Sequence, residues 1–237
     1  QLTQTFLKKS QNKSSKAGRK AQRKSAKVSD NSPEDDSQEE KGRYYKSAAD
    51  KGDIDAMYHY ANMLEYGDGI QMNKEEACRY YKMAADKGHL DAMFNYAHML
   101  YSGQGIEENR EEACRYFKMA AEKGHLKSMT NYGFLLETGD GIAMNKEEAC
   151  RYYKIAADKG QIDAMNNYGF LLHHGDGVKM NKELACQYFK KAADQGHIDA
   201  MHSYGWMLRT GDGITKNQKE ALRYIKMAAD KGHSSAM

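Results

Sequence analysis

The chain has 237 residues, a single proline and a formal net charge of +3. Strand-forming runs are absent, which excludes a β-rich fold, and no apolar run approaches the roughly 20 residues of a membrane span. Abundant alanine, methionine, lysine, glutamate and leucine instead predict an almost wholly helical protein. We expect it to lie in the cytoplasm, without a membrane partner.

The first forty residues carry all of the net charge. Residues 28–40 hold six acids and no base, whereas residues 41–237 hold 27 charges of each sign. Residues 1–36 lack a helical period; their Lys- and Ser-rich part is typical of disorder, and residues 29–36 predict an acidic turn. We expect this arm either to contact an acidic surface, of protein or nucleic acid, or to act as a linker. Its bases are Lys8, Lys9, Lys13, Lys16, Arg19, Lys20, Arg23, Lys24 and Lys27.

From residue 37 onward the chain repeats itself with a period of 36 residues. A half repeat at 37–52 has Gly42 inside its expected helix, and a glycine there weakens a helix by about 1 kcal/mol, so we expect a degenerate cap. A period of this length, with two helical segments per copy, predicts an all-α solenoid of antiparallel helix pairs. Five full repeats follow at 53–88, 89–124, 125–160, 161–196 and 197–232, and residues 233–237 begin a further, truncated repeat.

Each full repeat contains a first helix, a glycine loop and a second helix, expected at 55–66, 67–72 and 73–87 in the first copy. Asn73 should cap the second helix while Glu76 reaches back in a capping box. Gly88 should end that helix in the left-handed conformation. Tyr80 and Tyr81 recur at helical spacing and should face the first helix.

One cysteine recurs at the same position in four of the repeats. Neighbouring helices pack about 8–10 Å apart, whereas a disulfide needs Cα atoms within roughly 7 Å. We therefore predict buried, reduced thiols and a reducing compartment. The cysteines are Cys78, Cys114, Cys150 and Cys186, and Leu222 takes their place in the fifth repeat.

A pattern of small and aromatic residues also recurs in every copy. In the first copy it comprises Ala56, Tyr60, Ala61, Gly67, Gly69, Ile70, Ala77, Tyr80, Tyr81, Ala84, Ala85 and Gly88. This pattern, which covers residues 37–237, resembles the Sel1-like repeat of the tetratricopeptide-like superfamily. The resemblance implies a right-handed superhelix and an adaptor that assembles complexes. Some secreted relatives carry a disulfide within each repeat, whereas this chain has one cysteine in each of four repeats.

Positions that differ between copies are the candidates for partner binding. They lie at offsets of four and three residues on the first helix of each repeat, so they form one stripe, which we expect to line the concave surface. Phe134, Phe170 and Trp206 should form an aromatic ladder, and aromatic residues and arginine are frequent interface hot spots. Alternatively, the rings only fill space between helices. The stripe consists of Tyr58, Asn62 and Glu65; Phe94, His98 and Tyr101; Thr130, Phe134 and Glu137; Asn166, Phe170 and His173; and His202, Trp206 and Arg209.

No set of residues indicates catalysis, a cofactor or a metal. His173 and His174 are adjacent and therefore poorly placed to share one metal ion. The Gly-Asp-Gly loops lack the Lys-Ser or Lys-Thr pair of a phosphate cradle, and no nucleophile has a matched base. The histidines beside the helix-ending glycines recur unchanged, which favours a structural role: His89, His125, His197 and His233.

Three functions are consistent with these features. The first is a non-enzymatic adaptor that holds an extended peptide or a helix of another protein. The second is a docking component of a ribonucleoprotein or a cytoskeletal filament, anchored by the basic arm. The third is the regulatory repeat region of a larger signalling enzyme.

Overall fold

The computed structural model describes residues 33–233, and the chain divides into two compact units, Gln1–Asn109 and Arg110–Met237. Across residues 33–233 the secondary structure consists of eleven helices without a strand, which confirms the all-α prediction. The first unit contains α2 (Pro33–Asp50), α3 (Ile54–Tyr66), α4 (Lys74–Asp86) and α5 (Leu90–Ser102). The second contains α6 (Arg110–Glu122), α7 (Leu126–Thr138), α8 (Lys146–Asp158), α9 (Ile162–His174), α10 (Lys182–Asp194), α11 (Ile198–Thr210) and α12 (Gln218–Asp230).

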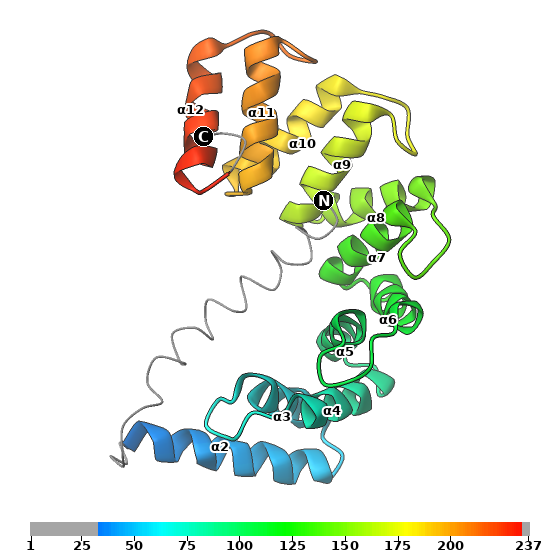
Figure 1. The fold of residues 1–237 in the computed structure, drawn as a ribbon, viewed down its shortest axis with the longest axis vertical. Helices are drawn as coiled ribbons and strands as arrows, with labels where there is room; N and C mark the ends of the chain where they lie inside the picture. Colours follow the sequence, from blue (N-terminus) through cyan, green and yellow to red (C-terminus); the bar gives the residue numbers. More distant parts are fainter. Residues whose placement is uncertain (1–32, 234–237) are drawn as a thin grey trace. The chain divides into compact units, whose positions relative to one another are not determined.

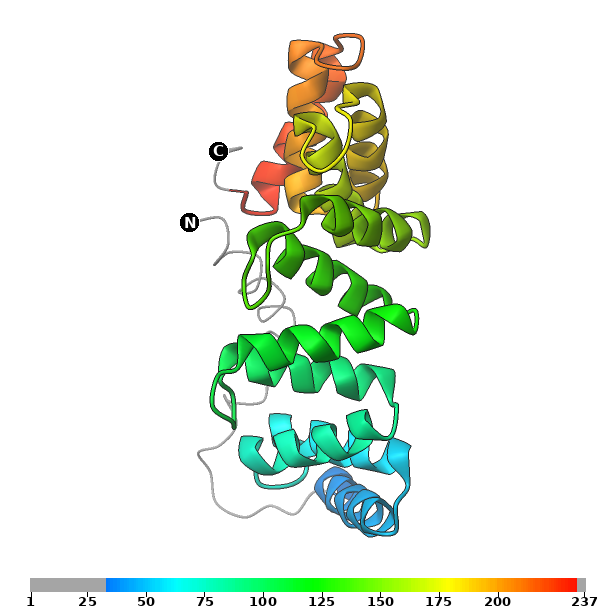
Figure 2. The same ribbon diagram turned by 90° about the vertical axis from the view of Figure 1, so that its right-hand side faces the viewer.

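Within each unit, every helix packs against the helix that follows it in the chain. Figure 1 shows this order for α2 to α5 and for α6 to α12, and Figure 2 shows the same pairs from the side. Consecutive packing of helix pairs is the arrangement of an α-solenoid, in which each repeat contacts only its neighbours. The fold class predicted from the repeat is therefore confirmed.

α2 differs from its prediction in where it starts and in the role of its glycine. It begins at Pro33, so residues 33–36, for which we predicted an acidic turn, are helical. Proline suits the first position of a helix, where its missing N–H has no partner, and acidic residues suit the first turn. Gly42 is buried, and a Cβ atom there would lie 2.6 Å from Ile70 Cγ2, so this glycine permits close packing.

The second helix of the first full repeat begins at its predicted asparagine cap. Asn73 Oδ1 accepts a hydrogen bond of 3.0 Å from the Glu76 N–H. The predicted return bond of the capping box is wrong, because the Asn73 N–H instead donates to the Leu64 carbonyl at 2.8 Å. The Glu76 carboxylate lies 3.5 Å from Asn73 Nδ2. The cap therefore also ties the start of α4 to the end of α3.

Gly88 ends the same helix as predicted. Its φ is +99°, a left-handed value that suits glycine. The Gly88 N–H donates to the Ala85 carbonyl at 2.9 Å and the His89 N–H donates to the Ala84 carbonyl at 3.1 Å. These two bonds form a Schellman motif, which satisfies the last carbonyls of α4 before the chain enters α5.

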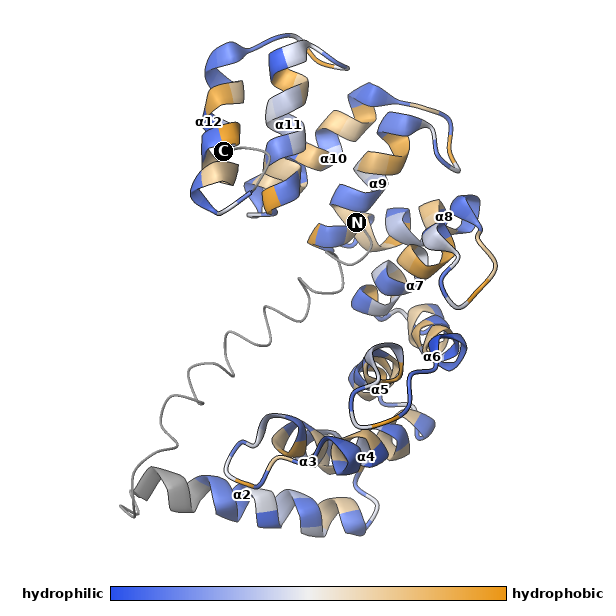
Figure 3. Ribbon diagram, viewed as in Figure 1, coloured by the Kyte–Doolittle hydropathy of each residue, from blue (hydrophilic) through white to orange (hydrophobic). Residues whose placement is uncertain are grey.

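Alanines and aromatic rings form the core of each helix pair. In the first pair, Ala77 and Tyr81 are fully buried, and the rings of Tyr60 and Tyr80 meet edge to face with centroids 4.9 Å apart. Figure 3 shows hydrophobic and hydrophilic residues alternating along the helices. The small alanines allow the helices to approach closely, and the tyrosines fill the space that remains.

Candidate functional site

The predicted stripe lies on the first helix of each repeat, namely α3 and α5 in the first unit and α7, α9 and α11 in the second. Most of its side chains are half-buried, so each presents part of its surface to solvent. Thr130 is the exception on the buried side: it is 2% exposed, and its hydroxyl donates to the Leu126 carbonyl. In each unit, the stripe residues are therefore partly exposed to solvent and partly covered by the fold.

Phe134, Phe170 and Trp206 occupy equivalent positions on three helices of the second unit. Phe170 exposes 44% of its surface, whereas Phe134 and Trp206 are half-buried. Among the large exposed hydrophobic side chains of residues 110–233, Phe170 is the aromatic one. The ring of Phe170 thus has a face that the fold of this unit leaves uncovered.

His173 links two neighbouring repeats at the edge of this aromatic group. Its Nε2 lies 2.7 Å from Asp212 Oδ2, and its ring meets the Trp206 ring edge to face with centroids 6.0 Å apart. Asp212 also forms an ion pair with Lys182, with 2.8 Å between Oδ1 and Nζ. Lys182, and to a smaller extent His173, hold the pKa of Asp212 below its usual range. The carboxylate is therefore already occupied by groups of its own chain.

The neighbouring His174 belongs to a different contact. Its ring lies over Phe170, with centroids 4.1 Å apart, and its Nδ1 is 2.9 Å from the Phe170 carbonyl oxygen. His173 and His174 thus have separate partners. In residues 33–233, no group of three or more His, Cys, Asp or Glu side chains could hold a metal ion.

α11 contributes basic groups to the same end of the stripe. The His202 ring stacks on the His233 ring with centroids 4.4 Å apart. Burial lowers the pKa of His202, and the nearby positive groups of His233 and Arg209 lower it further. Arg209 is exposed and forms no ion pair within residues 33–233. Its guanidinium therefore lacks a carboxylate partner in this part of the chain, three residues after Trp206.

The stripe in the first unit is held by internal hydrogen bonds. The Tyr81 hydroxyl donates to Glu65 Oε2 at 2.7 Å and lies 2.9 Å from Asn62 Oδ1, while Asn62 Nδ2 donates to the Tyr58 carbonyl. Burial raises the pKa of Glu65, and the bond from Tyr81 opposes this shift. Glu65 and Asn62 are therefore supports for a buried tyrosine.

On α5 of the same unit, the three stripe residues are half-buried. The rings of Phe94 and His98 lie with centroids 6.3 Å apart. Burial lowers the pKa of His98, which favours its neutral form. Tyr101 is the third stripe residue on this helix.

The tyrosine and glutamate pair recurs once in the second unit and was missed from the sequence. The Tyr153 hydroxyl donates to Glu137 Oε2 at 2.9 Å. Repeats without the tyrosine also lack the glutamate: Phe117 accompanies Tyr101, Phe189 accompanies His173, and Ile225 accompanies Arg209. This joint change between copies, sixteen residues apart in the sequence, is the signal that could have revealed the pair.

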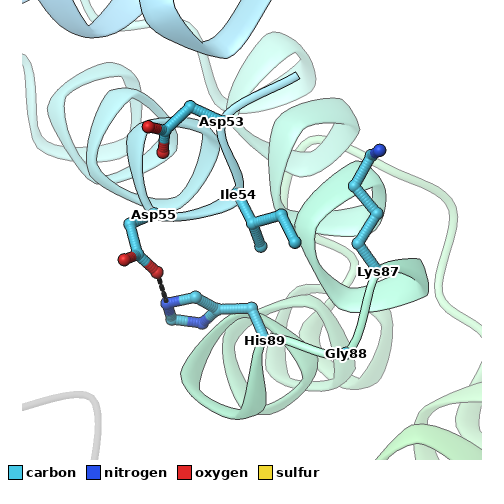
Figure 4. A pocket seen from close by; sticks show the side chains of 6 residues that line it. All are labelled: Asp53, Ile54, Asp55, Lys87, Gly88 and His89. Carbon is cyan, nitrogen blue, oxygen red and sulfur yellow. Dashed lines mark ion pairs between the residues drawn. The ribbon is translucent and has the colours of Figure 1, made fainter.

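Three of the repeated histidines, His89, His125 and His197, cap first helices, which confirms their structural role. His89 Nδ1 accepts from the Ala92 N–H at 3.1 Å, and His89 Nε2 lies 3.5 Å from Asp55 Oδ1. The ring also stacks on Tyr58 with centroids 4.5 Å apart. Figure 4 shows the Asp55 carboxylate and the His89 ring pointing toward each other, while the Lys87 amino group points away from them. These residues line an open hollow of about 420 Å³. The hollow surrounds a helix cap.

The glycine loop of one repeat contacts the second helix of the preceding repeat. Gly105 has a φ of +72°, and a Cβ atom there would lie 2.3 Å from the Lys74 carbonyl oxygen, so the loop rests directly on the start of α4. The Lys74 side chain donates to Gln104 of the same loop at 2.8 Å. In the second unit, the equivalent ion pairs join Arg110 to Asp140, Lys146 to Asp176 and Lys182 to Asp212.

All four cysteines are buried, reduced thiols, as predicted. Burial raises the pKa of Cys114, Cys150 and Cys186 to about 11. A thiol with a pKa this high is almost wholly protonated near neutral pH and is a poor nucleophile. These positions therefore contribute to packing.

The predicted basic arm, Lys8 to Lys27, lies outside the residues that the structure describes. Between residues 33 and 233, none of the helices combines the length and the apolar content that crossing a bilayer requires. The cytoplasmic location remains a prediction.

Comparisons with known proteins extend these observations. The Sel1 repeat model matches residues 43–53, 54–89, 90–125, 126–161, 162–197 and 198–233. A search of curated proteins found no match.

Solved structures share the fold. A Sel1 repeat protein from Oxalobacter formigenes is 26% identical, with a TM-score of 0.74, and the match covers 83% of this chain and 84% of that one. The protein c5321, a protective antigen present in uropathogenic Escherichia coli strains, is 24% identical with a TM-score of 0.77. That match covers 82% of this chain, which spans 42% of the length of c5321. The repeat pattern, the packing of its helix pairs and these matches lead to one conclusion: the chain belongs to the Sel1 repeat family.

Proposed function

We propose that the chain is a protein-binding scaffold and that the stripe of the second unit receives a segment of a partner protein. Sel1 repeat proteins generally serve as protein-interaction scaffolds, which supports this class of function. The observation that carries the proposal is the exposed ring of Phe170, between the equivalent positions of Phe134 and Trp206. Exposed aromatic residues at positions free to vary between repeats are suited to act as hot spots.

The stripe residues of the first unit support a smaller part in binding. Asn62 and Glu65 already bond to the buried Tyr81 hydroxyl. Removing them from that network to contact a partner would leave the hydroxyl unsatisfied, at a cost of about 1–3 kcal/mol. The half-buried rings of Tyr58 and Phe94 remain as contact surface.

The test replaces Phe134, Phe170 and Trp206 by alanine and measures capture of partner proteins from a lysate. The matched control replaces Met144 and Met180, which are also exposed apolar residues of the second unit but lie in loops. We expect the stripe variant to lose capture while its helix content, measured by circular dichroism, stays unchanged. Equal capture by the stripe and the loop variants would refute the proposal.

The basic arm supports a second contact, with an acidic assembly. Residues 1–27 hold nine bases and no acid. If the arm binds nucleic acid through these bases, affinity should fall steeply as salt rises, because each neutralised phosphate releases counterions. Removal of residues 1–28 should flatten that dependence, and an unchanged slope would assign the arm to a linker role.

A further inference from the structure

We propose that the α9 and α11 end of the stripe recognises an acidic segment of a partner protein and holds it more tightly as the pH falls below neutrality. This inference rests on the proposed function and adds the chemistry of the partner.

Basic groups gather at this end of the second unit. His173 and His174 lie on α9 with ring centroids 4.8 Å apart, and His202 of α11 stacks on His233. His202 and Arg209 lie seven residues apart, about two turns of α11, so they share one side of this helix. Three imidazoles and one guanidinium therefore lie on α9 and α11, and the fourth imidazole, His233, follows the end of α12.

The acidic groups that face this cluster are already paired. Asp212, from the loop after α11, bonds to Lys182 of α10 and to His173. Asp199 of α11 lies 3.4 Å from His233 Nε2. From the side of α12, the uncharged Gln218 amide donates to the Arg209 carbonyl. The guanidinium of Arg209 has no carboxylate partner within residues 33–233, so a carboxylate from outside would complete the arrangement.

The equivalent position in other repeats shows that this end differs from the rest of the stripe. Glu65 and Glu137 stand where Arg209 stands, and both carboxylates accept from buried tyrosines. In the last repeat Ile225 replaces the tyrosine, so the position is released from the core and carries the opposite charge. A partner that contacts Arg209 must therefore differ in charge from one that contacts Glu65 or Glu137.

Apolar contact area lies beside the basic groups. Phe170 is 44% exposed and Trp206 is half-buried one turn before Arg209. An arginine next to a tryptophan is a favourable setting for a hot spot, because the ring excludes water from the charged contact. The surface thus fits a segment that carries both acidic and apolar side chains.

Charge favours a polypeptide over a nucleic acid. Arg209 is the permanent cation of the cluster, and histidine side chains are mostly neutral near pH 7.5. A polyphosphate chain would need several permanent cations along its path for tight binding. One or two carboxylates suffice to match this surface.

The expected pH dependence follows from the positive groups around His202. Burial, His233 and Arg209 all lower the pKa of His202. A partner carboxylate would offset the repulsion between these groups and raise that pKa, so binding would be coupled to proton uptake. Proton uptake on binding means that affinity rises as the pH falls.

The experiment uses the whole chain and two fluorescent peptides, one alternating glutamate with leucine and one with glutamine in place of glutamate. Fluorescence anisotropy at about pH 7.5 and about pH 6 gives four affinities. We expect the glutamate peptide to bind at least tenfold more tightly than the glutamine peptide, a difference of about 1.4 kcal/mol or more, and its affinity to rise at the lower pH.

Two variants locate the effect. Arg209→Glu restores the residue type of Glu65 and Glu137 and should weaken binding of the glutamate peptide about tenfold, as for the loss of a charge-assisted contact. Arg223→Glu on the second helix α12 changes the net charge equally and should have little effect. His202→Asn, the residue found at position 166, should keep the preference for glutamate and remove the rise at low pH.

Three results would overturn the inference. These are equal binding of the two peptides, equal effects of the Arg209 and Arg223 variants, and stronger binding of a single-stranded oligothymidylate than of the glutamate peptide. If Arg209→Glu leaves capture of a natural partner intact while the alanine variant of the aromatic residues abolishes it, the proposed scaffold function stands and this inference fails.

Discussion

The Tyr153 hydroxyl donates a hydrogen bond of 2.9 Å to the Glu137 carboxylate, and so joins the core of a helix pair to the stripe on its surface. The tyrosine is fully buried, and burial raises the pKa of Glu137. Tyr81 and Glu65 repeat the same arrangement in the first unit. What the stripe displays at this position therefore depends on what the second helix buries beneath it.

This dependence predicts a strong coupling between the two residues. Tyr153→Phe removes the donor to a partly buried carboxylate and should lower the free energy of unfolding by about 1–3 kcal/mol. The double variant Glu137→Tyr with Tyr153→Phe reproduces Tyr101 and Phe117 of another repeat and should recover most of that loss. Urea unfolding measures the unchanged chain, Tyr153→Phe, Glu137→Tyr and the double variant. Simple addition of the two single effects in the double variant would show that the residues act independently.

The loop glycines should differ in their tolerance of alanine. Gly105→Ala would bring a Cβ atom to 2.3 Å from the Lys74 carbonyl oxygen, whereas nothing lies within 4 Å of a Cβ atom at Gly52. Both glycines have a positive φ, so both substitutions carry a backbone cost of about 1–2 kcal/mol. Because the added methyl group at Gly105 also overlaps Lys74, the Gly105 variant should lose roughly 1–3 kcal/mol more of its free energy of unfolding. Equal shifts in the thermal midpoint would contradict the close approach.

One first helix of the chain already carries glutamine in place of the capping histidine. Gln161 caps α9 through the same bond that His89 makes at the start of α5. His89→Gln should therefore nearly preserve stability, whereas His89→Ala should cost about 1 kcal/mol, the usual value of a lost N-cap. If chemical unfolding shows the same loss for both variants, the stacking of His89 on Tyr58 matters more than the cap.

Acid should destabilise the chain in part through His98. Burial lowers its pKa in the folded state below the ordinary value near 6.5, so the unfolded state binds its proton more readily. The stabilising contribution is full above the unfolded pKa and is lost as the pH falls toward the folded pKa. His98→Phe should flatten the decline of the unfolding free energy between about pH 7 and about pH 5. An unchanged slope would place the acid sensitivity elsewhere.

Helix positions followed from the sequence because five copies show which residues the stacking requires. Asparagine caps, helix-ending glycines and buried alanines are local signals, and the structure confirms each of them. The predicted return bond of the capping box is wrong because the Asn73 N–H bonds to the Leu64 carbonyl of the preceding helix, and a local sequence signal does not show that contact. The packing role of Gly42 against Ile70 depends in the same way on contact between elements.

The stripe was harder to predict in detail than the helices that carry it. Offsets of four and three residues place its members on one face, but they do not show which side chains the protein uses internally. Glu65 and Asn62 bond to the hydroxyl of a buried tyrosine, and His173 bonds to Asp212. Phe170 is 44% exposed, and Arg209 is exposed in the repeat where Ile225 replaces the buried tyrosine.

The most direct test of the scaffold function is the region that a bound partner protects from amide hydrogen exchange. The measurement compares the free chain with the chain saturated by its main captured partner. We expect protection to rise on the first helices α7, α9 and α11 and to remain unchanged on α8 and α10. Protection confined to α8 and α10 would contradict a binding surface on the stripe.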